Sequence, residues 1–431
     1  MRILRQGDRG ASVELLQLAL TRAGYNPGRI DGIFGMQTAA ALRAFQRSSG
    51  LVPDAIAGPK THQALMPYYT GYVNHRIMRG DSFYRLAVSY KTTLRAIETA
   101  NPKLDPFNLK IGSTVVIPLG FPLVPTNISW SSTLNSLCVQ GLQARYPFIS
   151  TGAAGISILG KPIHYIKAGS GANGVLYNAS HHANEWLTTP VLMHFMEELL
   201  FAYSNDEQIF GTPAQDIFKT ASLWLVPMVN PDGVDLVTGD ISSGADYNSA
   251  RALSAAYPQI PFPSGWKANI RGTDLNLQYP AGWEIAREIK FAQGFDRPGP
   301  RDYVGSAPLY ASESRAMYQL TRSVDPALTL AYHSQGQVIY WKYLDFEPPL
   351  SREIAMKFGA VSGYTVEETP YSSGFAGYKD WFIQDFDRPG YTIEMGLGEN
   401  PLPVSQFEKI YEDNLGILTL GMQMTSGYGI I

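Results

Sequence analysis

Residues 174–186 read Gly174-Val175-Leu176-Tyr177-Asn178-Ala179-Ser180-His181-His182-Ala183-Asn184-Glu185-Trp186. The first part is a largely apolar run typical of a buried strand, and a helical stretch over residues 189–203 begins soon after it. Between them, His182 and Glu185 form an His-x-x-Glu pair, which at such a turn can aim an imidazole and a carboxylate at one point. Both groups are zinc ligands. The stretch therefore predicts a metal site at the end of a buried strand.

Further apolar runs follow this turn and alternate with helical stretches. The runs cover residues 222–229, 328–331 and 391–393, and a helical stretch covers residues 312–323. Such alternation predicts an α/β fold, in which a sheet carries helices on both faces. Functional sites in such folds gather at the ends of the strands.

Two more polar residues end apolar runs. A catalytic zinc needs three protein ligands and an open position, and His333, directly after the run 328–331 and Tyr332, fits as the third ligand. Glu394 ends the run 391–393. A buried charge needs a partner, so Glu394 is either a salt-bridged strand end or a general base that activates water and protonates the leaving amine.

These residues resemble the zinc carboxypeptidase family in order and approximate spacing, over residues 130–425. The resemblance implies that this catalytic domain has a mixed sheet with helices on both faces. The matching segments are His182-Ala183-Asn184-Glu185-Trp186, Asn230-Pro231-Asp232-Gly233, Gly272-Thr273-Asp274-Leu275-Asn276, His333-Ser334 and Thr392-Ile393-Glu394. The resemblance implies one zinc ion held by His182, Glu185 and His333, with Glu394 as catalytic base. It also implies that Asp274 orients His182, as ligand imidazoles generally require.

The resemblance implies further site residues. In the register set by Asp274, Lys267 stands where the family has the arginine that stabilises the oxyanion, and Arg271 is a nearby substitute; the sequence leaves this choice open. The substrate-binding residues it implies are Asn276, Ser334 and Tyr371, the last resembling the family's mobile tyrosine that covers the substrate.

One departure from the family bears on specificity. Its exopeptidases place an arginine after the asparagine of Asp-x-Asn to hold the substrate's C-terminal carboxylate, whereas Leu277 follows Asn276 here. The chain therefore resembles the γ-D-glutamyl-L-diamino acid endopeptidases, which implies cleavage of the γ-D-glutamyl to meso-diaminopimelate bond in peptidoglycan stem peptides. The alternatives are an ordinary carboxypeptidase, with Arg271 capturing the carboxylate, and a wall-binding protein without activity.

Residues 1–68 predict a small three-helix bundle, because apolar stripes at 13–20 and 39–45 are separated by Gly-rich turns. This part resembles a peptidoglycan-binding domain. The matching pieces are Gly7-Asp8-Arg9-Gly10, Leu15-Leu16-Gln17, Asp31-Gly32-Ile33-Phe34-Gly35, Thr38, Phe45-Gln46 and Gly58-Pro59-Lys60-Thr61. Ala55 stands where the family has glycine, and we expect a local difference in that turn.

Residues 72–119 predict a β-α-α-β module that resembles a lysin motif (LysM), a module implicated in binding N-acetylglucosamine polymers. The matching pieces are Gly80-Asp81-Ser82, Asn101-Pro102, Leu109, Gly112 and Ile117-Pro118. A Pro-punctuated linker over residues 120–129 separates it from the catalytic domain. The two modules imply peptidoglycan and muropeptides as partners.

Composition narrows the remaining possibilities. A net charge of −3 and a pI of about 6.2 give no basic surface for nucleic acid or anionic membrane. Cys138, the single cysteine, lies in an apolar stretch and is expected to be a buried hydrophobe. No stretch reaches the ~18 apolar residues of a membrane span, and residues 1–8 lack the apolar core of a signal peptide. The expected location is the cytoplasm, in a sporulating cell or forespore, or the wall after release; the oligomeric state stays open.

Overall fold

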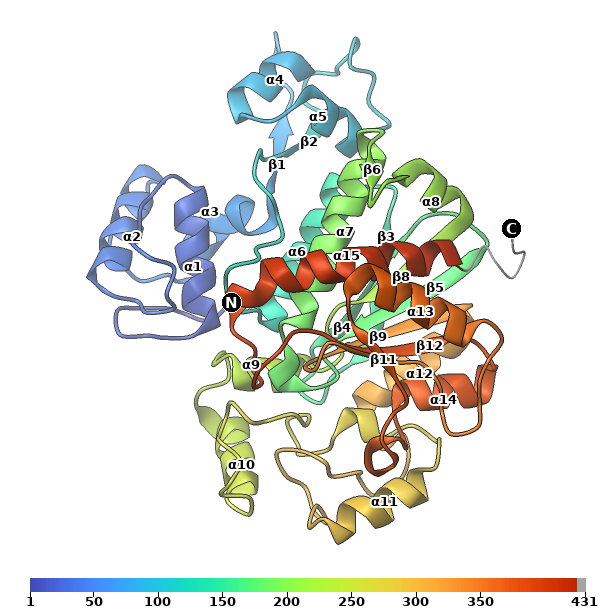
Figure 1. The fold of residues 1–431 in the computed structure, drawn as a ribbon. Coiled ribbons are helices and arrows are strands. Elements are labelled where there is room, and N and C mark those ends of the chain that lie inside the picture. The colour runs from blue at the N-terminus through green and yellow to red at the C-terminus, as the bar shows by residue number, and fades with distance from the viewer. Residues whose placement is uncertain (425–431) are drawn as a thin grey trace. The chain divides into compact units, whose positions relative to one another are not determined.

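The structure is a computed structural model that describes residues 1–424. The chain divides into two compact units, with the boundary between Ser150 and Thr151. Figure 1 labels the helices and strands along the chain. The predicted end of the catalytic domain, residue 425, lies just outside the described residues.

The first unit begins with helices α1 (Ala11–Arg22), α2 (Met36–Ser48) and α3 (Pro59–Thr70). Leu16 and Leu20 of α1, Leu42 of α2 and Leu65 of α3 are fully buried. The predicted apolar stripes therefore form the core of the predicted small helical bundle.

Two glutamines hold the turns of this bundle in the same way. The Gln17 side chain donates to the Asp31 carboxylate (3.0 Å) and accepts the Gly32 amide (3.0 Å). The Gln46 side chain donates to Asp54 (2.9 Å) and accepts the Ala55 amide (3.0 Å). Each aspartate also accepts the amide two residues further on, from Ile33 and Ile56. The two turns, at residues 31–33 and 54–56, therefore have the same hydrogen-bonding pattern.

The expected difference at Ala55 is wrong. Ala55 has φ 59° and Gly32 has φ 69°, so alanine adopts the same left-handed conformation as glycine. This conformation costs an L-residue ~1–2 kcal/mol. The hydrogen bonds of Gln46 and Asp54 keep the turn in place despite that cost.

The predicted β-α-α-β module follows. It consists of β1 (Tyr72–Arg76), α4 (Phe83–Tyr90), α5 (Leu94–Ala100) and β2 (Thr114–Pro118). The two strands pair antiparallel, from Tyr72 opposite Pro118 to Arg76 opposite Thr114. Ser82 and Thr93 cap the two helices through their side-chain oxygens, as N-cap residues commonly do.

Helix α6 (Ser132–Arg145) also belongs to the first unit. Its last residue, Arg145, donates hydrogen bonds to the carbonyls of Gly71, Leu119 and Phe121. Cys138 lies on this helix and is fully buried, as expected.

The second unit contains an eight-stranded sheet in the order β11-β10-β12-β9-β5-β8-β4-β3. Its strands are β3 (Ser150–Ile156), β4 (Pro162–Ala168), β5 (Asn173–Ala179), β8 (Ala221–Val226), β9 (Leu328–His333), β10 (Val338–Tyr340), β11 (Thr365–Glu367) and β12 (Gly390–Glu394). Strands β8, β5, β9 and β12 run parallel, whereas β4 and β10 run antiparallel to their neighbours β8 and β12. The predicted mixed sheet is confirmed. A separate hairpin joins β6 (Gln208–Ile209) and β7 (Thr212–Pro213).

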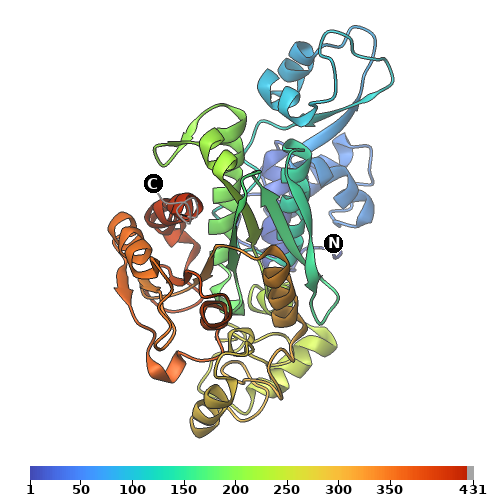
Figure 2. The ribbon, with the colours of Figure 1, turned by 90° about the vertical axis from the view of Figure 1, so that its right-hand side faces the viewer.

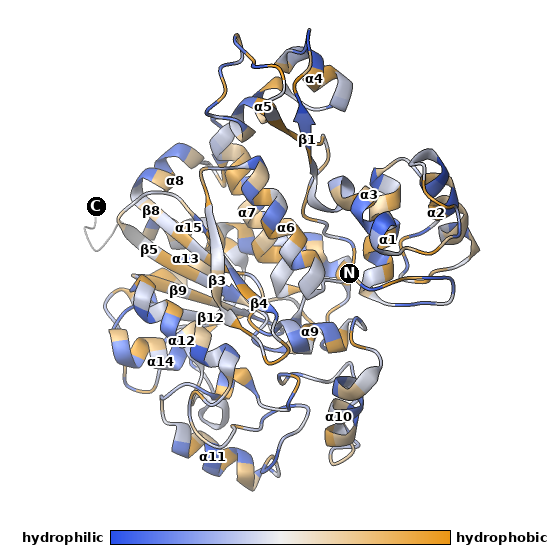
Figure 3. Ribbon diagram, turned by 180° about the vertical axis from the view of Figure 1, so that it is seen from behind, coloured by the Kyte–Doolittle hydropathy of each residue, from blue (hydrophilic) through white to orange (hydrophobic). Residues whose placement is uncertain are grey.

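Helices cover both faces of this sheet (Figures 1 and 2). On one face lie α7 (Thr188–Ser204), α13 (Ser351–Ser362) and α15 (Phe407–Gln423), and on the other lie α12 (Ser312–Val324) and α14 (Tyr378–Phe386). Tyr177 of β5 donates to the Leu418 carbonyl of α15 (2.9 Å), while its neighbour Leu176 faces the opposite cluster with Met317 and Phe382. Figure 3 shows the apolar character of the central strands.

The remaining helices of the second unit lie in its connections. They are η1 (Ala183–Glu185), α8 (Ala214–Thr220), α9 (Pro231–Val237), α10 (Gly244–Ser254), η2 (Leu275–Leu277), α11 (Trp283–Ala292), η3 (Tyr371–Ser373) and η4 (Val404–Gln406). Within residues 1–424, none of the helices has the length and apolar character needed to cross a membrane.

Candidate active site

Three adjacent parallel strands bring the predicted site residues to one edge of the sheet. His182 follows β5, His333 is the last residue of β9, and Glu394 is the last residue of β12. Glu394 and His333 are paired positions in the β12–β9 register. Because the carboxyl ends of parallel strands meet at one edge, these side chains converge.

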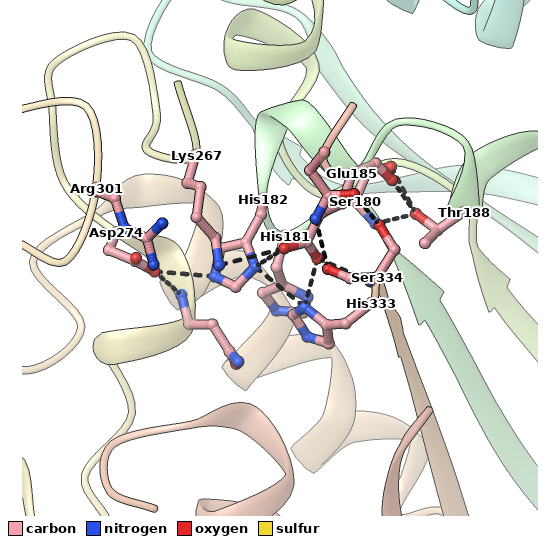
Figure 4. Close-up of polar contacts among 12 residues, drawn as sticks. Ser180, His181, His182, Glu185, Thr188, Lys267, Asp274, Arg301, His333 and Ser334 are labelled. Atoms are coloured by element: carbon pink, nitrogen blue, oxygen red, sulfur yellow. Dashed lines mark hydrogen bonds and ion pairs between the residues drawn. The ribbon is translucent and has the colours of Figure 1, made fainter. Parts of the chain in front are cut away.

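His182, Glu185 and His333 form a compact buried cluster (Figure 4). The Nδ1 atom of His182 lies 2.9 Å from Glu185 Oε1, and the Nδ1 atom of His333 lies 2.9 Å from Glu185 Oε2. The two Nδ1 atoms lie 3.1 Å apart. The sequence prediction that these three residues lie together thus matches the geometry.

The cluster fits a divalent metal ion. Its three ligand atoms lie within 4.8 Å of one another, and they are the nitrogen and oxygen ligands that zinc takes in catalytic sites. Two imidazole nitrogens that face each other and one carboxylate can all be satisfied by one cation placed among them. Without a cation, hydrogen bonds satisfy fewer of these buried nitrogens and oxygens.

Asp274 fixes the orientation of His182. Its Oδ1 atom lies 3.1 Å from His182 Nε2, the nitrogen on the far side of the ring from the cluster. The amides of Asn276 and Asp302 donate to the same carboxylate, each at 3.1 Å. Burial raises the pKa of Asp274, but His182, the charge of Lys267 and the Asp302 amide more than offset this and hold the pKa below its ordinary value. A charged carboxylate therefore directs Nδ1 of His182 toward the cluster.

Glu394 lies on the wall of the same pocket. Burial, and secondly the negative charge of Glu185, raise the pKa of Glu394 to about 8. A carboxyl group shifted in this direction can both accept and release a proton near neutral pH, because its pKa is close to the ambient pH.

The structure distinguishes Lys267 from Arg271. The Nζ atom of Lys267 lies 3.2 Å from Glu185 Oε1, and Lys267 lines the pocket. Burial disfavours its charge, but Glu185 more than compensates and raises the pKa of Lys267. Arg271 pairs with Asp246 at 3.1 Å, and its side chain is 49% exposed. Of these two residues, Lys267 is therefore the cation that lies beside the cluster and in the pocket.

The expected substrate-binding residues occupy different positions. Asn276 lines the pocket beside Leu277, and its side-chain oxygen accepts the Tyr378 amide (2.9 Å). Tyr371 is 67% exposed and packs edge-on against Phe375.

Ser334 contacts the cluster of His182, Glu185 and His333 rather than the open pocket. Its amide donates to Glu185 Oε2 (3.3 Å), and its hydroxyl donates to Asn400 (2.8 Å).

His181, which no sequence pattern singled out, lies directly behind the cluster. It is fully buried, its Nε2 atom lies 2.9 Å from the Tyr279 hydroxyl, and its ring stacks on that of His333 at 5.9 Å between centroids. Its place beside His182 in the sequence was the only available signal.

The pocket has a volume of about 220 Å³ and is also lined by several charged residues that were not predicted from the sequence. They are Lys290, Arg301, Asp302, Lys379 and Asp380. They come from α11, α14 and the connection between α11 and α12, and no local pattern links them to the His-x-x-Glu pair.

The fold and this site define a metallopeptidase. The profile of the zinc carboxypeptidase family matches residues 137–416, and the chain belongs to that family. Over 299 residues it is 45% identical to gamma-D-glutamyl-L-diamino acid endopeptidase 1 of Lysinibacillus sphaericus, covering 69% of this chain and 73% of that protein. It is also 41% identical to the uncharacterized protein YqgT of Bacillus subtilis, covering 63% of this chain and 72% of that protein.

Further comparisons agree with the fold and the modules. Bovine thrombin-activatable fibrinolysis inhibitor, solved in complex with tick carboxypeptidase inhibitor, superposes with a TM-score of 0.55 at 17% identity, covering 70% of this chain and 99% of that chain. The profile of a peptidoglycan binding domain matches residues 9–65, and that of the NFP LysM2 domain matches residues 68–120.

Proposed function

We propose that the chain is an endopeptidase that hydrolyses the amide bond between γ-D-glutamate and meso-diaminopimelate in peptidoglycan stem peptides. In this proposal His182, Glu185 and His333 hold one zinc ion. Bound zinc supplies Lewis acidity, which polarises the scissile carbonyl and lowers the pKa of water.

The protein's own residues carry the proton transfers and the charge stabilisation. Glu394 accepts a proton from the attacking water and delivers it to the leaving amine, which its raised pKa suits. The Lys267 ammonium stabilises the oxyanion that develops on the carbonyl, since it is the cation beside the cluster. Asn276 positions the substrate, Tyr371 covers it, and Ser334 holds Glu185 through its amide.

The observation that carries the endopeptidase assignment is the position of Leu277. Leu277 lines the pocket beside Asn276 and is 8% exposed. An apolar side chain there offers nothing to pair with a C-terminal carboxylate and would penalise its desolvation. The 45% identity to an enzyme named for the γ-D-glutamyl-L-diamino acid bond supports the same substrate.

Mass analysis of the products tests this proposal. We expect L-Ala-γ-D-Glu to be released from the tetrapeptide stem, and a hippuryl-type carboxypeptidase substrate to react far more slowly. Preferential removal of single C-terminal residues from α-linked peptides would overturn the endopeptidase assignment.

We further propose that residues 1–68 and 72–119 are separate modules that anchor the enzyme on peptidoglycan, joined to the catalytic domain by residues 120–129. Removal of residues 1–119 should reduce sedimentation with intact wall while cleavage of small stem peptides persists. Because this removal takes away two of the three carbonyls that Arg145 contacts, those of Gly71 and Leu119, the unfolding of the shortened chain should be measured alongside. Full co-sedimentation of the shortened chain would contradict the anchoring role.

A further inference from the structure

One cation of the pocket has donors that no protein group uses. Arg301 lines the pocket with a side chain that is 42% exposed, and its Nε atom donates to the Asp302 carboxylate. Among residues 1–424, no group accepts a hydrogen bond from its Nη1 or Nη2 atoms. A guanidinium held through Nε presents these two terminal donors as a planar fork, which matches a carboxylate.

Asp302 holds Arg301 in place. Besides pairing with Arg301, its carboxylate contacts the Nζ atom of Lys290 (3.0 Å), and its amide donates to Asp274 Oδ2 (3.1 Å). Asp302 adopts a left-handed conformation with φ 62°. A non-glycine residue in this region costs ~1–3 kcal/mol, and such residues cluster at functional sites. The guanidinium is thus fixed relative to the Asp274 carboxylate that orients His182.

The other cations of the pocket are already engaged. The Nζ atom of Lys379 lies 2.5 Å from Asp380 and donates to the Lys342 carbonyl at 2.7 Å. Lys290 pairs with Asp302, and Lys267 pairs with Glu185. Arg301 is therefore the pocket cation prepared for an anionic group of the substrate.

Arg301 lies on the Lys267 side of the cluster. The charge of Arg301 is near enough to Lys267 to affect it. Burial, and secondly this charge, would lower the pKa of Lys267, but Glu185 raises it overall. In Figure 4 Arg301, Lys267 and Asp274 lie on one side of His182, with Ser334 on the other. Lys267 is the residue proposed to stabilise the scissile carbonyl oxygen. An anion bound by Arg301 therefore belongs to the acyl part of the substrate, close to the scissile carbonyl.

The proposed substrate carries such an anion. In a γ-linked glutamyl peptide the scissile carbonyl comes from the side chain, so the α-carboxylate stays free, a short aliphatic spacer away. An α-linked residue other than glutamate has no carboxylate at that place, and an α-linked glutamyl residue carries its acylated nitrogen next to the scissile carbonyl instead of next to the carboxylate. We propose that Arg301 binds the free α-carboxylate of the γ-linked D-glutamyl residue and thereby selects an acyl residue that carries a free carboxylate at this distance from the scissile carbonyl. This inference rests on the proposed function.

Two tripeptides test the inference. They are L-Ala-γ-D-Glu-meso-diaminopimelate and its analogue with an α-carboxamide on the D-glutamyl residue. We expect the native protein to prefer the carboxylate by about 10- to 100-fold in kcat/KM, the effect of losing charge-assisted hydrogen bonds. Arg301→Gln should bring the ratio of the two rates close to one. Because the ratio is taken on a single enzyme preparation, partial misfolding of the variant does not change it.

Arg297→Gln is the matched control. Arg297 also pairs through Nε with the aspartate beside it, Asp296 (2.8 Å), but its side chain is 66% exposed and lies outside the residues that line the pocket. This variant should keep the native preference. A second readout is calorimetric binding of the product L-Ala-γ-D-Glu, which Arg301→Gln should weaken by a similar factor.

The other outcomes overturn either the inference or the proposed function, and they can be told apart. Equal cleavage of both tripeptides by the native protein, at the glutamyl bond, would overturn the role of Arg301 and leave the proposed function standing. A third tripeptide, with L-lysine in place of diaminopimelate, shows whether Arg301 instead reads the leaving group. If Arg301→Gln removes discrimination between lysine and diaminopimelate rather than between acid and amide, the inference is wrong. Failure to cleave any glutamyl bond would overturn the proposed function itself.

Discussion

Replacing Asp274 by asparagine tests whether a charged carboxylate orients the His182 ligand. The Asp274 carboxylate accepts hydrogen bonds from His182 Nε2 and Asn276 N on one oxygen and from Asp302 N on the other, each at 3.1 Å. The substitution would keep the shape of the side chain but replace one of these oxygens by an NH₂ group. The three donors around it would stay where they are.

The size of the effect follows from this geometry. If the amide oxygen faces His182 and Asn276, the NH₂ group faces the Asp302 amide, and two donors meet in a buried place. Such an unsatisfied group costs ~1–3 kcal/mol, and the opposite orientation is worse because it sets the NH₂ group against two donors. Loss of a carboxylate behind a ligand imidazole typically weakens metal binding by about 10- to 100-fold. We expect Asp274→Asn to weaken zinc binding by that factor and to destabilise the metal-free protein by ~1–3 kcal/mol.

Zinc competition against a chelator measures the first effect, and urea unfolding of metal-free protein measures the second. Asp246→Asn is the control, because Asp246 also pairs with a cation, Arg271, but its side chain is 37% exposed and belongs to neither the cluster nor the lining of the pocket. The control should change neither quantity. Unchanged zinc affinity in Asp274→Asn would refute the reasoning that the Asp274 carboxylate orients His182.

Three further predictions concern the base and the two small modules. Glu394→Gln should retain zinc, because Glu394 is outside the ligand cluster, and should lower kcat by ~10²–10⁴-fold; near-native turnover on stem peptides would remove it from the mechanism. Ala55→Gly should stabilise the first module by up to ~1 kcal/mol in urea unfolding, since it relieves the left-handed alanine at φ 59° but adds chain entropy; destabilisation would contradict the strain. The amide of Met78, and secondly His75, lower the pKa of Asp81, so its stabilisation is present above the unfolded-state pKa and is lost as the pH falls through the folded-state pKa. Thermal melts of Asp81→Asn should therefore lose less stability on acidification than native melts, and equal losses would argue against this linkage.

The sheet and the cluster of His182, Glu185 and His333 were predictable because their signals are local. His182, Glu185, His333 and Glu394 each stand at or just after the end of an apolar run, and parallel strands bring such positions together whatever the details of the loops.

Arg301 was not predictable because nothing near it in the sequence indicates a site. Its role depends on Asp302, whose amide reaches Asp274 across a connection of irregular structure. The position of that connection relative to Asp274 is set by tertiary contacts. Hydrophobic periodicity carries no information about it.

The turn at Ala55 shows the opposite kind of error. The resemblance to other proteins suggested that alanine would change the turn, yet Gln46 imposes the conformation that Gln17 imposes at Gly32. Side-chain hydrogen bonds outweigh the preference of alanine for other conformations. A comparison of turn residues alone does not include these bonds.

Because Cys138 is buried, its reaction with a thiol reagent reports local opening of the protein. The thiol is the only one in the chain, it lies on α6, and solvent does not reach it. A thiol reagent in excess can modify the protein only when the packing around α6 loosens, so the labelling rate counts those openings without any engineered probe. The same measurement made with and without wall fragments would show whether binding to the wall lowers the rate of opening around this helix.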